Sequence, residues 1–510
     1  MTNRTRDAVP ATHAPTPRID GAQWQDAPPE NLSSNLTAST TPNANTDMRA
    51  AWQAAVALHL PVAFWRQPRT TTASAIVSLA PPCQQAPNFL SRAPGFYLAP
   101  FRESSAPFFL PADIRLTFLP DGADVSFARA ETETEASRQT TAAWSAAFAA
   151  ACATDRAADG APFLAKWYVP KSDSAHAPIA QHDYERLVND AIDFIRQRNI
   201  AKVVLSRTVN AALPAEFDPV LLFDALCKRY AHAFVSLVAV PGVGTWIGAS
   251  PELLLASDAT TLRTMALAGT QPRPDTTIDP ASVRWGEKEI VEQELVSRYV
   301  RTFFEDAGYP GFTEQGPQTV TAGKVFHLQT SFSIALPEAD RLQLANQVLG
   351  KLHPTSAVCG MPRSEALSFI VEREGYDRSF YSGFLGPVFL DDRSTLYVNL
   401  RCMQLFGNSA TLYVGGGITA ESNPEAEWHE TVVKSQTILA VLGSAGGEEQ
   451  SPAPADPAHT DPAHTTSQPP PPARRRDEHT RTAPTVPAPT VPTRAAQRHP
   501  SSQTHLVTAP

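Results

Sequence analysis

A glutamate on the apolar face of a predicted helix is the first residue in this sequence that could do chemistry. The segment 287–306 has helical periodicity, and Glu292 is followed on the same face, three, four and seven residues later, by Leu295, Val296 and Tyr299. An ionised carboxylate on an apolar face is costly unless it is paired or bound to a cation. Glu292 is therefore a candidate metal ligand.

The last predicted helix, 424–442, repeats this arrangement. It carries Glu427, Glu430 and Lys434 on the stripe that continues as its apolar face. Mg²⁺ takes oxygen ligands, and it usually keeps waters or substrate oxygens beside one or two carboxylates. Two helices that each turn acids inward suggest a Mg²⁺ site, although each glutamate could instead cap its helix or meet an arginine.

A run of glycines precedes this helix. Gly415, Gly416 and Gly417 would let a ligand approach backbone N–H groups closely, which suits a carboxylate. Arg401 lies among apolar residues in the predicted strand 396–406 and could make a bidentate contact to a carboxylate. The glycines also fit an ordinary tight turn between strands.

Two further charged residues open apolar runs. Lys202 begins the strand-like segment K-V-V-L-S-R, and Glu252 precedes the run L-L-L. Charges at such positions are common on the edges of sheets, and that interpretation stays open for both residues.

Five ordered segments resemble the chorismate-utilising enzymes, the family of isochorismate, anthranilate, aminodeoxychorismate and salicylate synthases. The resemblance covers about residues 184–442. Its most specific stretches are S-P-E-L-L from Ser250, A-G-T from Ala268, H-P-T-S-A-V-C-G from His353, Y-S-G from Tyr381, and G-G-G-I from Gly415 with E-W-H-E-T from Glu427. Five matches in order make a coincidence very improbable.

Two positions indicate which reaction of that family this chain resembles. Members that use water are similar to this chain in having a lysine at Lys202, whereas members that transfer an amine have glutamine there. Members that go on to expel pyruvate tend to have threonine at the position of Ala357. The resemblance thus implies an isochorismate synthase, with a salicylate synthase or an anthranilate or aminodeoxychorismate synthase as the alternative.

The resemblance also implies a mechanism, in which water adds at C2 of chorismate while the C4 hydroxyl leaves. Lys202 would take the proton of the water, which requires a neutral amine. Glu252 would protonate the leaving hydroxyl, which requires a protonated carboxyl, the opposite state to that of a surface glutamate.

Binding roles follow by the same resemblance. Glu292 and Glu430 would bind Mg²⁺, and Glu427 would orient the metal shell through water. The remaining substrate-binding residues fall into three groups: Gly269, Thr270 and Lys434 for the ring carboxylate, Arg401 with Gly415 and Gly416 for the enolpyruvyl carboxylate, and Ala357 in the wall of the site. Chorismate is the expected small-molecule partner.

Two departures from the family pattern concern substrate affinity. Gln293 stands where many members have a histidine after the metal-binding glutamate. Ser379, in D-R-S-F-Y, replaces an expected glycine.

The elements that must position these residues predict an α+β fold. Strand-like runs do not alternate strictly with helices, so large, mainly antiparallel sheets flanked by helices fit better than a Rossmann unit. Strands are predicted at 75–79, 114–118, 202–207, 234–240, 253–255, 396–406 and 410–413, and helices at 183–198, 220–230, 287–306, 341–352, 364–371 and 424–442.

Composition divides the chain into four parts. Proline-, threonine- and alanine-rich ends predict a disordered leader at 1–46 and a disordered tail at 444–510, because such segments bury too little apolar surface to order. Between them we expect one catalytic domain, with an N-terminal part at 47–170 and a chorismate-binding core at 171–443.

Bulk properties narrow the class of protein. The 510 residues carry a net charge of -9, which argues against binding nucleic acid, and no apolar run is long enough for a membrane span. Five scattered cysteines without metal-ligand spacing fit a reducing cytoplasm. We expect a cytoplasmic monomer or weak homodimer that serves menaquinone, siderophore or salicylate biosynthesis.

Overall fold

The structure describes most of the chain between residues 42 and 444. The computed structural model describes residues 42–119, 122–127, 134–157, 166–171, 176–274 and 278–444. Helix α1 (Pro42–Ala57) begins inside the predicted leader, whose residues 1–41 lie outside the described part, as does the tail from 445. Among the described residues, no helix combines the length and apolarity needed to cross a membrane.

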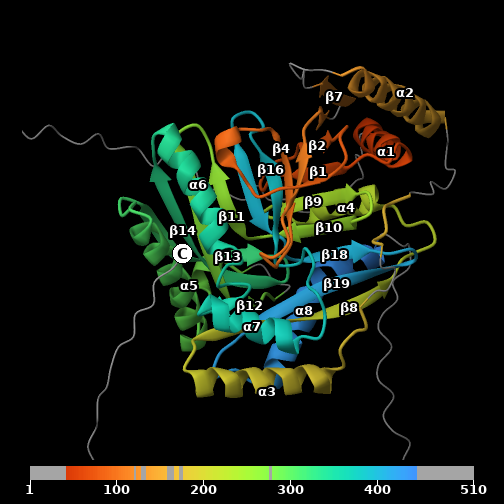
Figure 1. The fold of residues 1–510 in the computed structure, drawn as a ribbon. Coiled ribbons are helices and arrows are strands. Elements are labelled where there is room, and N and C mark those ends of the chain that lie inside the picture. Colours follow the sequence, from red (N-terminus) through yellow and green to blue (C-terminus); the bar gives the residue numbers. More distant parts are fainter. Residues whose placement is uncertain are drawn as a thin grey trace, which may run out of the picture. The chain divides into compact units, whose positions relative to one another are not determined.

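A ten-stranded antiparallel sheet runs through the molecule (Figure 1). Its central strands form long ladders, such as the ten-residue pairing of β8 with β19. In order across the sheet the strands are β15 (Gly360–Met361), β8 (Lys202–Ala212), β19 (Ser409–Ile418), β18 (Cys402–Leu405), β10 (Gly244–Ser250), β9 (Phe234–Val240), β1 (Val62–Arg66), β2 (Ala73–Val77), β6 (Ile114–Leu119) and β7 (Gly122–Phe127).

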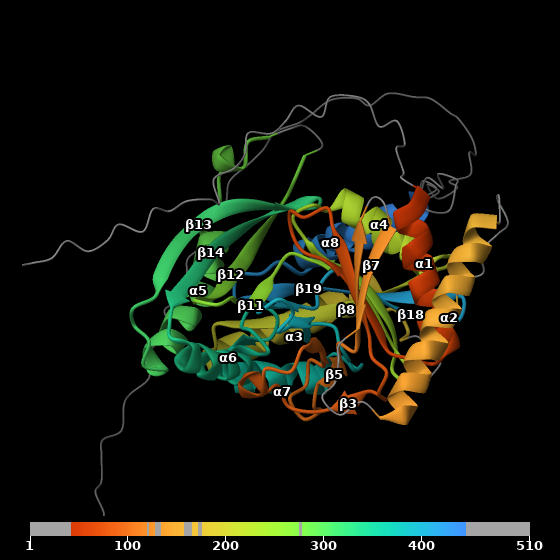
Figure 2. The same ribbon diagram turned by 90° about the horizontal axis from the view of Figure 1, so that it is seen from above.

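The second sheet has nine strands and is also antiparallel, with the long β13–β14 hairpin at one edge (Figure 2). In order the strands are β13 (Thr313–Ala322), β14 (Val325–Ala335), β12 (Thr261–Pro272), β11 (Leu253–Ser257), β17 (Ser394–Val398), β16 (Phe384–Val388), β4 (Gly95–Ala99), β5 (Phe108–Pro111) and β3 (Cys83–Gln84).

The two sheets pack face to face, and this explains why many strands are apolar on both faces. Strand β1 turns Phe64 towards the helices and Trp65 towards the other sheet, where it packs on Phe96 with ring centroids 5.6 Å apart. Strand β9 does the same with Leu237 and Val238. Such strands lose the polar–apolar alternation of a half-exposed sheet and become continuous apolar runs.

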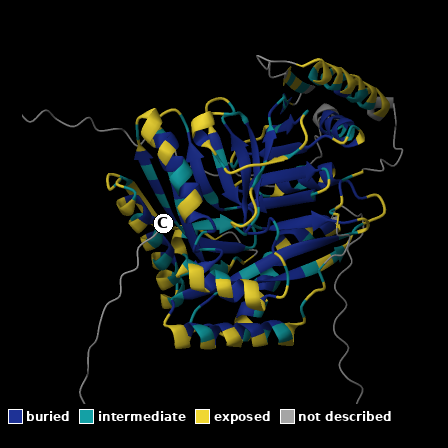
Figure 3. Cartoon of the chain, viewed as in Figure 1, coloured by how far each residue is buried: buried dark blue, intermediate teal, exposed yellow. Residues whose placement is uncertain are grey.

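Helices cover the outer faces of both sheets, so that buried residues concentrate in the strands (Figure 3). Helices α4 (Pro219–Arg229) and α8 (Pro424–Ser444) pack with α1 on the ten-stranded sheet, and α2 (Glu135–Ala157) packs on α1. The remaining four are α5 (Glu287–Asp306) and α6 (Glu338–Leu352), on the nine-stranded sheet, and α3 (Gln181–Arg198) and α7 (Arg363–Arg373), on the end of the ten-stranded sheet near β8. Short 3₁₀ turns occur at Phe89–Ser91 and Pro280–Ser282.

The predicted α+β class with large antiparallel sheets is confirmed. All six predicted helices are present, and α5 has the predicted limits. On α3 the whole predicted stripe is buried: Tyr184, Leu187, Val188, Ala191, Ile192 and Ile195.

One predicted strand is wrong. The apolar run 396–406 is two strands, because β17 belongs to the nine-stranded sheet and β18 to the ten-stranded one. Arg401 lies in the link between them, with a positive φ of 49°, and not within a strand. Both halves are buried on both faces, so their sequences merge into one apparent run. The glycines 415–417, for which a tight turn was the alternative, extend strand β19.

Candidate active site

A cavity lies where the chain crosses between the two sheets. It holds about 670 Å³ of empty space, part of it open to solvent, and we name it the central cavity. Two crossings run side by side along its wall, Pro251–Glu252 between β10 and β11, and 399–401 between β17 and β18. They are joined by hydrogen bonds from Ala249 N to Arg401 O (3.0 Å) and from Val398 N to Glu252 O (3.0 Å).

Lys202 enters the central cavity from the first position of β8. Its side chain is almost fully buried, and its Nζ lies 2.5 Å from Oε1 of Glu292 on α5. The prediction that Glu292 is an inward-facing acid is therefore confirmed in position, because only 14% of its side chain is exposed. The Lys202 amine and the Glu292 carboxylate are thus held against each other in the wall of the central cavity.

Glu252 enters the same cavity from the first crossing. The residue is 4% exposed, and its Oε1 accepts one long hydrogen bond of 3.3 Å from the hydroxyl of Thr355. Burial raises the pKa of Glu252 to about 7, although Thr355, Lys202 and Lys434 lower it. A carboxyl in this environment can be protonated near neutral pH, as an acid catalyst must be.

The A-G-T segment forms a bulge in strand β12. Gly269 has a φ of +67°, and the register of β12 with β14 shifts between Ala268 and Thr270. A glycine suits that left-handed backbone and also the close approach of α5, since an added Cβ would lie 3.2 Å from Glu289 Cβ. The bulge turns Gly269 and Thr270 to the wall of the central cavity.

Gln293 holds the bulge against α5. Its Oε1 accepts a hydrogen bond of 2.8 Å from Ala268 N, and its Nε2 donates to Ala266 O (3.2 Å) and to Thr330 Oγ1 (3.0 Å). Gln293, which stands where a histidine is expected, therefore uses both the oxygen and the nitrogen of its buried amide in hydrogen bonds.

Arg401 sits at the second crossing and is held by neutral partners. It donates from Nη1 to Thr437 Oγ1 (3.1 Å) and from Nη2 to His327 Nε2 (3.1 Å). His327 in turn donates from Nδ1 to Gly269 O (2.8 Å), which leaves Nε2 free to accept. Burial, followed by Arg401, lowers the pKa of His327 to about 3, so the imidazole is neutral. No carboxylate of the described residues pairs with Arg401, which can therefore bind an anion.

The glycine run makes room for three different groups. A Cβ on Gly415 would lie 2.9 Å from Tyr381 Oη, and one on Gly417 would lie 2.7 Å from Glu292 Oε1 and 2.8 Å from Lys202 Nζ. At Gly416 it would meet Glu427 Oε2 at 3.1 Å. A Cβ would press on the backbone and the Tyr381 hydroxyl at Gly415, and on charged side chains at Gly416 and Gly417, which explains three successive glycines within a strand.

Helix α8 contributes the second set of acids. Lys434 Nζ lies 2.6 Å from Glu430 Oε1 and donates to Gly415 O at 2.9 Å. Burial acts to raise the pKa of Glu430, but Lys434 and Lys288 outweigh it, and the pKa is lowered. Glu427 is fully buried; burial and the charge of Glu430 raise its pKa despite its ion pair with Lys288 (2.8 Å).

These acids fit a hard cation, although each one meets a lysine in this structure. The described residues contain no group of three acidic, histidine or cysteine side chains close enough to hold a metal together. However, Glu427 Oε2 is buried without a hydrogen-bond partner, and Glu430 Oε1 lies near it across Gly416. An orphaned carboxylate oxygen beside a second carboxylate is a donor set that suits Mg²⁺.

Eleven of the twelve predicted site residues line the central cavity: Lys202, Glu252, Gly269, Thr270, Glu292, Ala357, Arg401, Gly415, Gly416, Glu430 and Lys434. Glu427 lies behind Gly416, next to the cavity wall. Their roles remain predictions.

Several residues that the structure brings to the site have no role predicted from the sequence. His327 and Tyr381 line the central cavity, Thr355 donates to Glu252, and Lys288 pairs with Glu427. Thr355 and Tyr381 stand in two of the quoted motifs, so a signal existed for both. His327 stands in none of these motifs and gives no such signal.

This chain is similar to known proteins in both sequence and fold. A family model described as "Chorismate binding enzyme" matches residues 123–443. Isochorismate synthase EntC of Escherichia coli K12 is 31% identical over 267 residues, which cover 52% of this chain and 68% of that protein. The vibriobactin-specific isochorismate synthase of Vibrio cholerae is 31% identical over 266 residues, with coverages of 51% and 66%. The solved structure of the menaquinone-specific isochorismate synthase MenF of Escherichia coli aligns with a TM-score of 0.58 at 22% identity, over 77% of this chain and 91% of that chain, and shares its fold.

Proposed function

This chain belongs to the chorismate-binding enzyme family, and on that premise we propose that it isomerises chorismate to isochorismate. In this reaction the oxygen of a water molecule bonds to C2, the ring double bonds shift, and the C4–O bond breaks. One water enters and one leaves, so the product is an isomer of the substrate.

The observation that carries the proposal is a buried lysine and a buried, protonatable glutamate in one cavity. Lys202 takes the proton of the attacking water. Glu252, whose pKa burial raises to about 7, gives a proton to the departing hydroxide, which is a poor leaving group without it. Both side chains line the same cavity and are almost fully buried, so they can act on one bound ring.

The two carboxylates of chorismate fit the cations and amides of the central cavity. Arg401, which has only neutral partners, binds the enolpyruvyl carboxylate together with the amide of Gly415. The amides at Gly269 and Thr270, with Lys434, bind the ring carboxylate. Two separate anion sites fix the orientation of the ring, so that C2 and C4 face different groups.

We further propose that the reaction depends on Mg²⁺, which would neutralise the ring carboxylate and draw electron density from the ring when bound. Glu292 and Glu430 would hold it, and Glu427 would act through water. What supports this assignment is the oxygen-only donor set and the unpartnered Oε2 of Glu427.

The product is expected to retain its enolpyruvyl group. Ala357, in the cavity wall, offers no hydroxyl where pyruvate-expelling relatives tend to have threonine. Isochorismate would then enter menaquinone biosynthesis, as for the relative named menaquinone-specific, or else siderophore or salicylate biosynthesis.

The test is chromatography of the products formed from chorismate, with Mg²⁺ and with excess EDTA. We expect isochorismate as the product with Mg²⁺ and no turnover with EDTA. Release of pyruvate, or turnover that requires ammonia, would replace this proposal with a salicylate-forming or amine-transferring function.

A further inference from the structure

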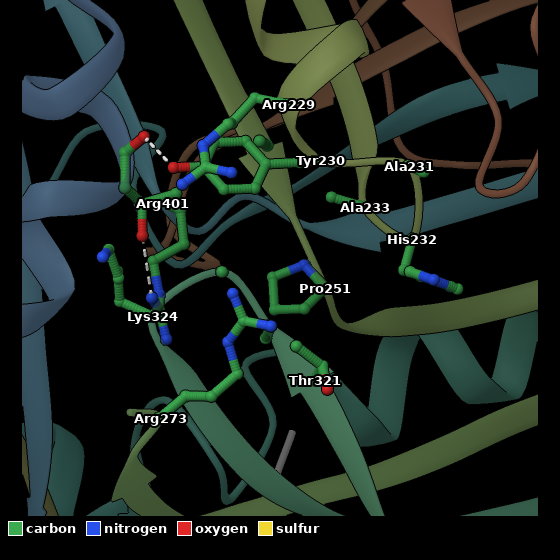
Figure 4. Close-up of a pocket in the computed structure, with 14 residues that line it drawn as sticks. Arg229, Tyr230, Ala231, His232, Ala233, Pro251, Arg273, Thr321, Lys324 and Arg401 are labelled. Carbon is green, nitrogen blue, oxygen red and sulfur yellow. Dashed lines mark hydrogen bonds between the residues drawn. The ribbon is translucent and has the colours of Figure 1, made fainter. Parts of the chain in front are cut away.

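A second, larger cavity adjoins the central cavity. It holds about 1040 Å³, part of it open to solvent, and we name it the basic pocket (Figure 4). Its wall is built by the end of α4 and the loop that leads to β9, the turn of the β13–β14 hairpin and the residue that follows β12. Pro251 and Arg401 belong to the walls of both cavities. The two cavities therefore share a wall at the crossings between the sheets.

The charged residues described in the wall of the basic pocket are all basic. They are Arg229, Arg273, Lys324 and Arg401, and no described residue of this wall is acidic. Among the described residues, neither Arg229 nor Arg273 forms an ion pair with a carboxylate, and Nε of Arg273 is buried without a hydrogen-bond partner. These two arginines, with Arg401, give the described wall a local excess of positive charge in a chain whose net charge is -9.

Hydrogen bonds and close contacts within the protein hold the wall of the basic pocket in place. Arg273 N donates to Lys324 O at 2.8 Å, which fixes these two cationic residues beside each other at the end of the β12–β14 ladder. Gly323, with a φ of +67°, forms the hairpin turn, and a Cβ there would lie 3.2 Å from the ring of Tyr230. Thr437 links both cavities, because its backbone oxygen accepts from Tyr230 Oη (2.8 Å) and its hydroxyl accepts from Arg401.

We propose that the basic pocket is an antechamber that binds the dianionic substrate on its way to Arg401. This inference rests on the proposed function, because it takes the substrate to be a cyclic dicarboxylate. A dianion meets repulsion over most of an acidic protein, and a cavity lined by cations alone focuses the field and raises the local anion concentration. Arg273 and Arg229 hold one carboxylate at the outer end while Arg401 is reached by the other.

The shared guanidinium distinguishes an antechamber from an independent anion site. Arg401 is buried, has only neutral partners and is the one cation of the described residues that lines both cavities, so it can receive an anion from Arg273 at their common wall. Charges outside the reacting centre act mainly on the rate of association and its dependence on salt. The prediction is therefore kinetic: fewer cations in the basic pocket slow association, whereas chemistry at the ring is unchanged.

The experiment measures association of chorismate with the Mg²⁺-loaded protein by stopped-flow tryptophan fluorescence. The Glu252→Gln variant is used so that chorismate is not consumed, and Trp246 is the expected reporter because it stacks on Tyr413 of the central cavity wall at 5.2 Å. Adding Arg229→Gln and Arg273→Gln is expected to lower the association rate constant about tenfold at low salt and to flatten its dependence on NaCl. The dissociation rate constant should change less than twofold.

Two controls make the result specific. Arg186→Gln with Arg298→Gln removes the same charge from exposed positions on α3 and α5, and should leave association within about twofold of the parent. Arg273→Lys keeps the charge and should restore most of the rate. An unchanged association rate in the Arg229→Gln, Arg273→Gln protein, or an equal loss in the exposed-arginine control, overturns the antechamber. Failure of the wild-type protein to convert chorismate would instead count against the proposed function.

Discussion

The two adjoining cavities use positive charge in opposite ways. The two lysines that line the central cavity are each paired with a glutamate, Lys202 with Glu292 and Lys434 with Glu430, and Lys288 pairs with Glu427 beside the cavity wall. In the basic pocket none of the described lining residues is acidic, and Arg229 and Arg273 pair with no carboxylate of the described residues. The charges of the first cavity are compensated at short range, whereas those of the second act at long range.

This difference separates two tasks that one site could not combine. Paired, buried groups have protonation states that depend on their partners, which is what acid–base chemistry requires. Unpaired cations attract anions from a distance but would bind a product as tightly as a substrate if they surrounded the reacting ring. Arg401 belongs to both cavities and is the only cation of the central cavity without an acid partner among the described residues.

Removal of the Lys202 amine should have the largest effect. Lys202→Ala is expected to lower kcat by about 1000-fold or more, because a positioned base is lost, while chorismate still binds. Product chromatography and calorimetry measure the two effects. Lys228→Ala, at an exposed position of α4, is the matched control. Retention of more than a few per cent of activity would exclude lysine as the base.

Loss of a carboxylate on α8 tests whether the paired acids also serve a metal. Glu430→Ala is expected to weaken Mg²⁺ binding about 100-fold and chorismate binding with it, because both use the same charge. Calorimetry of Mg²⁺ binding gives the answer, with Glu425→Ala on the exposed side of α8 for comparison. Unchanged metal affinity would show that the ligand assignment is wrong.

The pH dependence of activity distinguishes the two cavities further. The raised pKa of Glu252, about 7, means that its protonated fraction falls about tenfold between pH 6 and pH 8, and kcat/KM should fall with it. The arginines of the basic pocket stay charged over this range, so the dependence on salt should persist. A pH profile of kcat/KM for the wild-type protein, recorded at low and at high salt, measures this. A value of kcat/KM that does not fall between pH 6 and pH 8 would contradict the role of Glu252.

The smallest expected effect is on stability and compares a paired with an unpaired cation. Lys288→Met leaves the buried carboxylate of Glu427 without its partner and should cost about 1 to 2 kcal/mol, less than a fully buried pair because Lys288 is partly exposed. Arg229→Gln breaks no ion pair and should stay within about 0.5 kcal/mol. Urea unfolding of both variants measures the free energy of unfolding. Equal losses would mean that the ion pair of Lys288 contributes no more to stability than the unpaired Arg229.

Much of the fold could be predicted because its helices are amphipathic. The stripe on α3 and the limits of α5 follow from periodicity alone. The sheets were harder, since strands buried on both faces lose their alternation. The run 396–406 concealed a change of sheet for this reason, and the long β13–β14 hairpin carries no strong apolar signal, because most of β13 is exposed.

The acidic residues of the site could be predicted from the sequence, but their ion-pair partners could not. Glu292, Glu427 and Glu430 attract notice because acids on an apolar helix face need an explanation. The ion pairs of Glu292 and Glu427 join α5 to β8 and α8 to α5. No local sequence pattern predicts contacts between segments so far apart. Ser379 shows the reverse case: its φ of +50° accounts for the glycine expected there, and the serine adopts that conformation nonetheless.

The paired crossings at Glu252 and Arg401 have a mechanical consequence. Each crossing joins one sheet to the other within a few residues, and backbone hydrogen bonds hold the two crossings together. Arg401 directly precedes β18 of the ten-stranded sheet and donates to His327 of β14 in the other sheet. A slide of one sheet over the other would therefore break that hydrogen bond, so the guanidinium keeps its place only while the two layers keep their alignment.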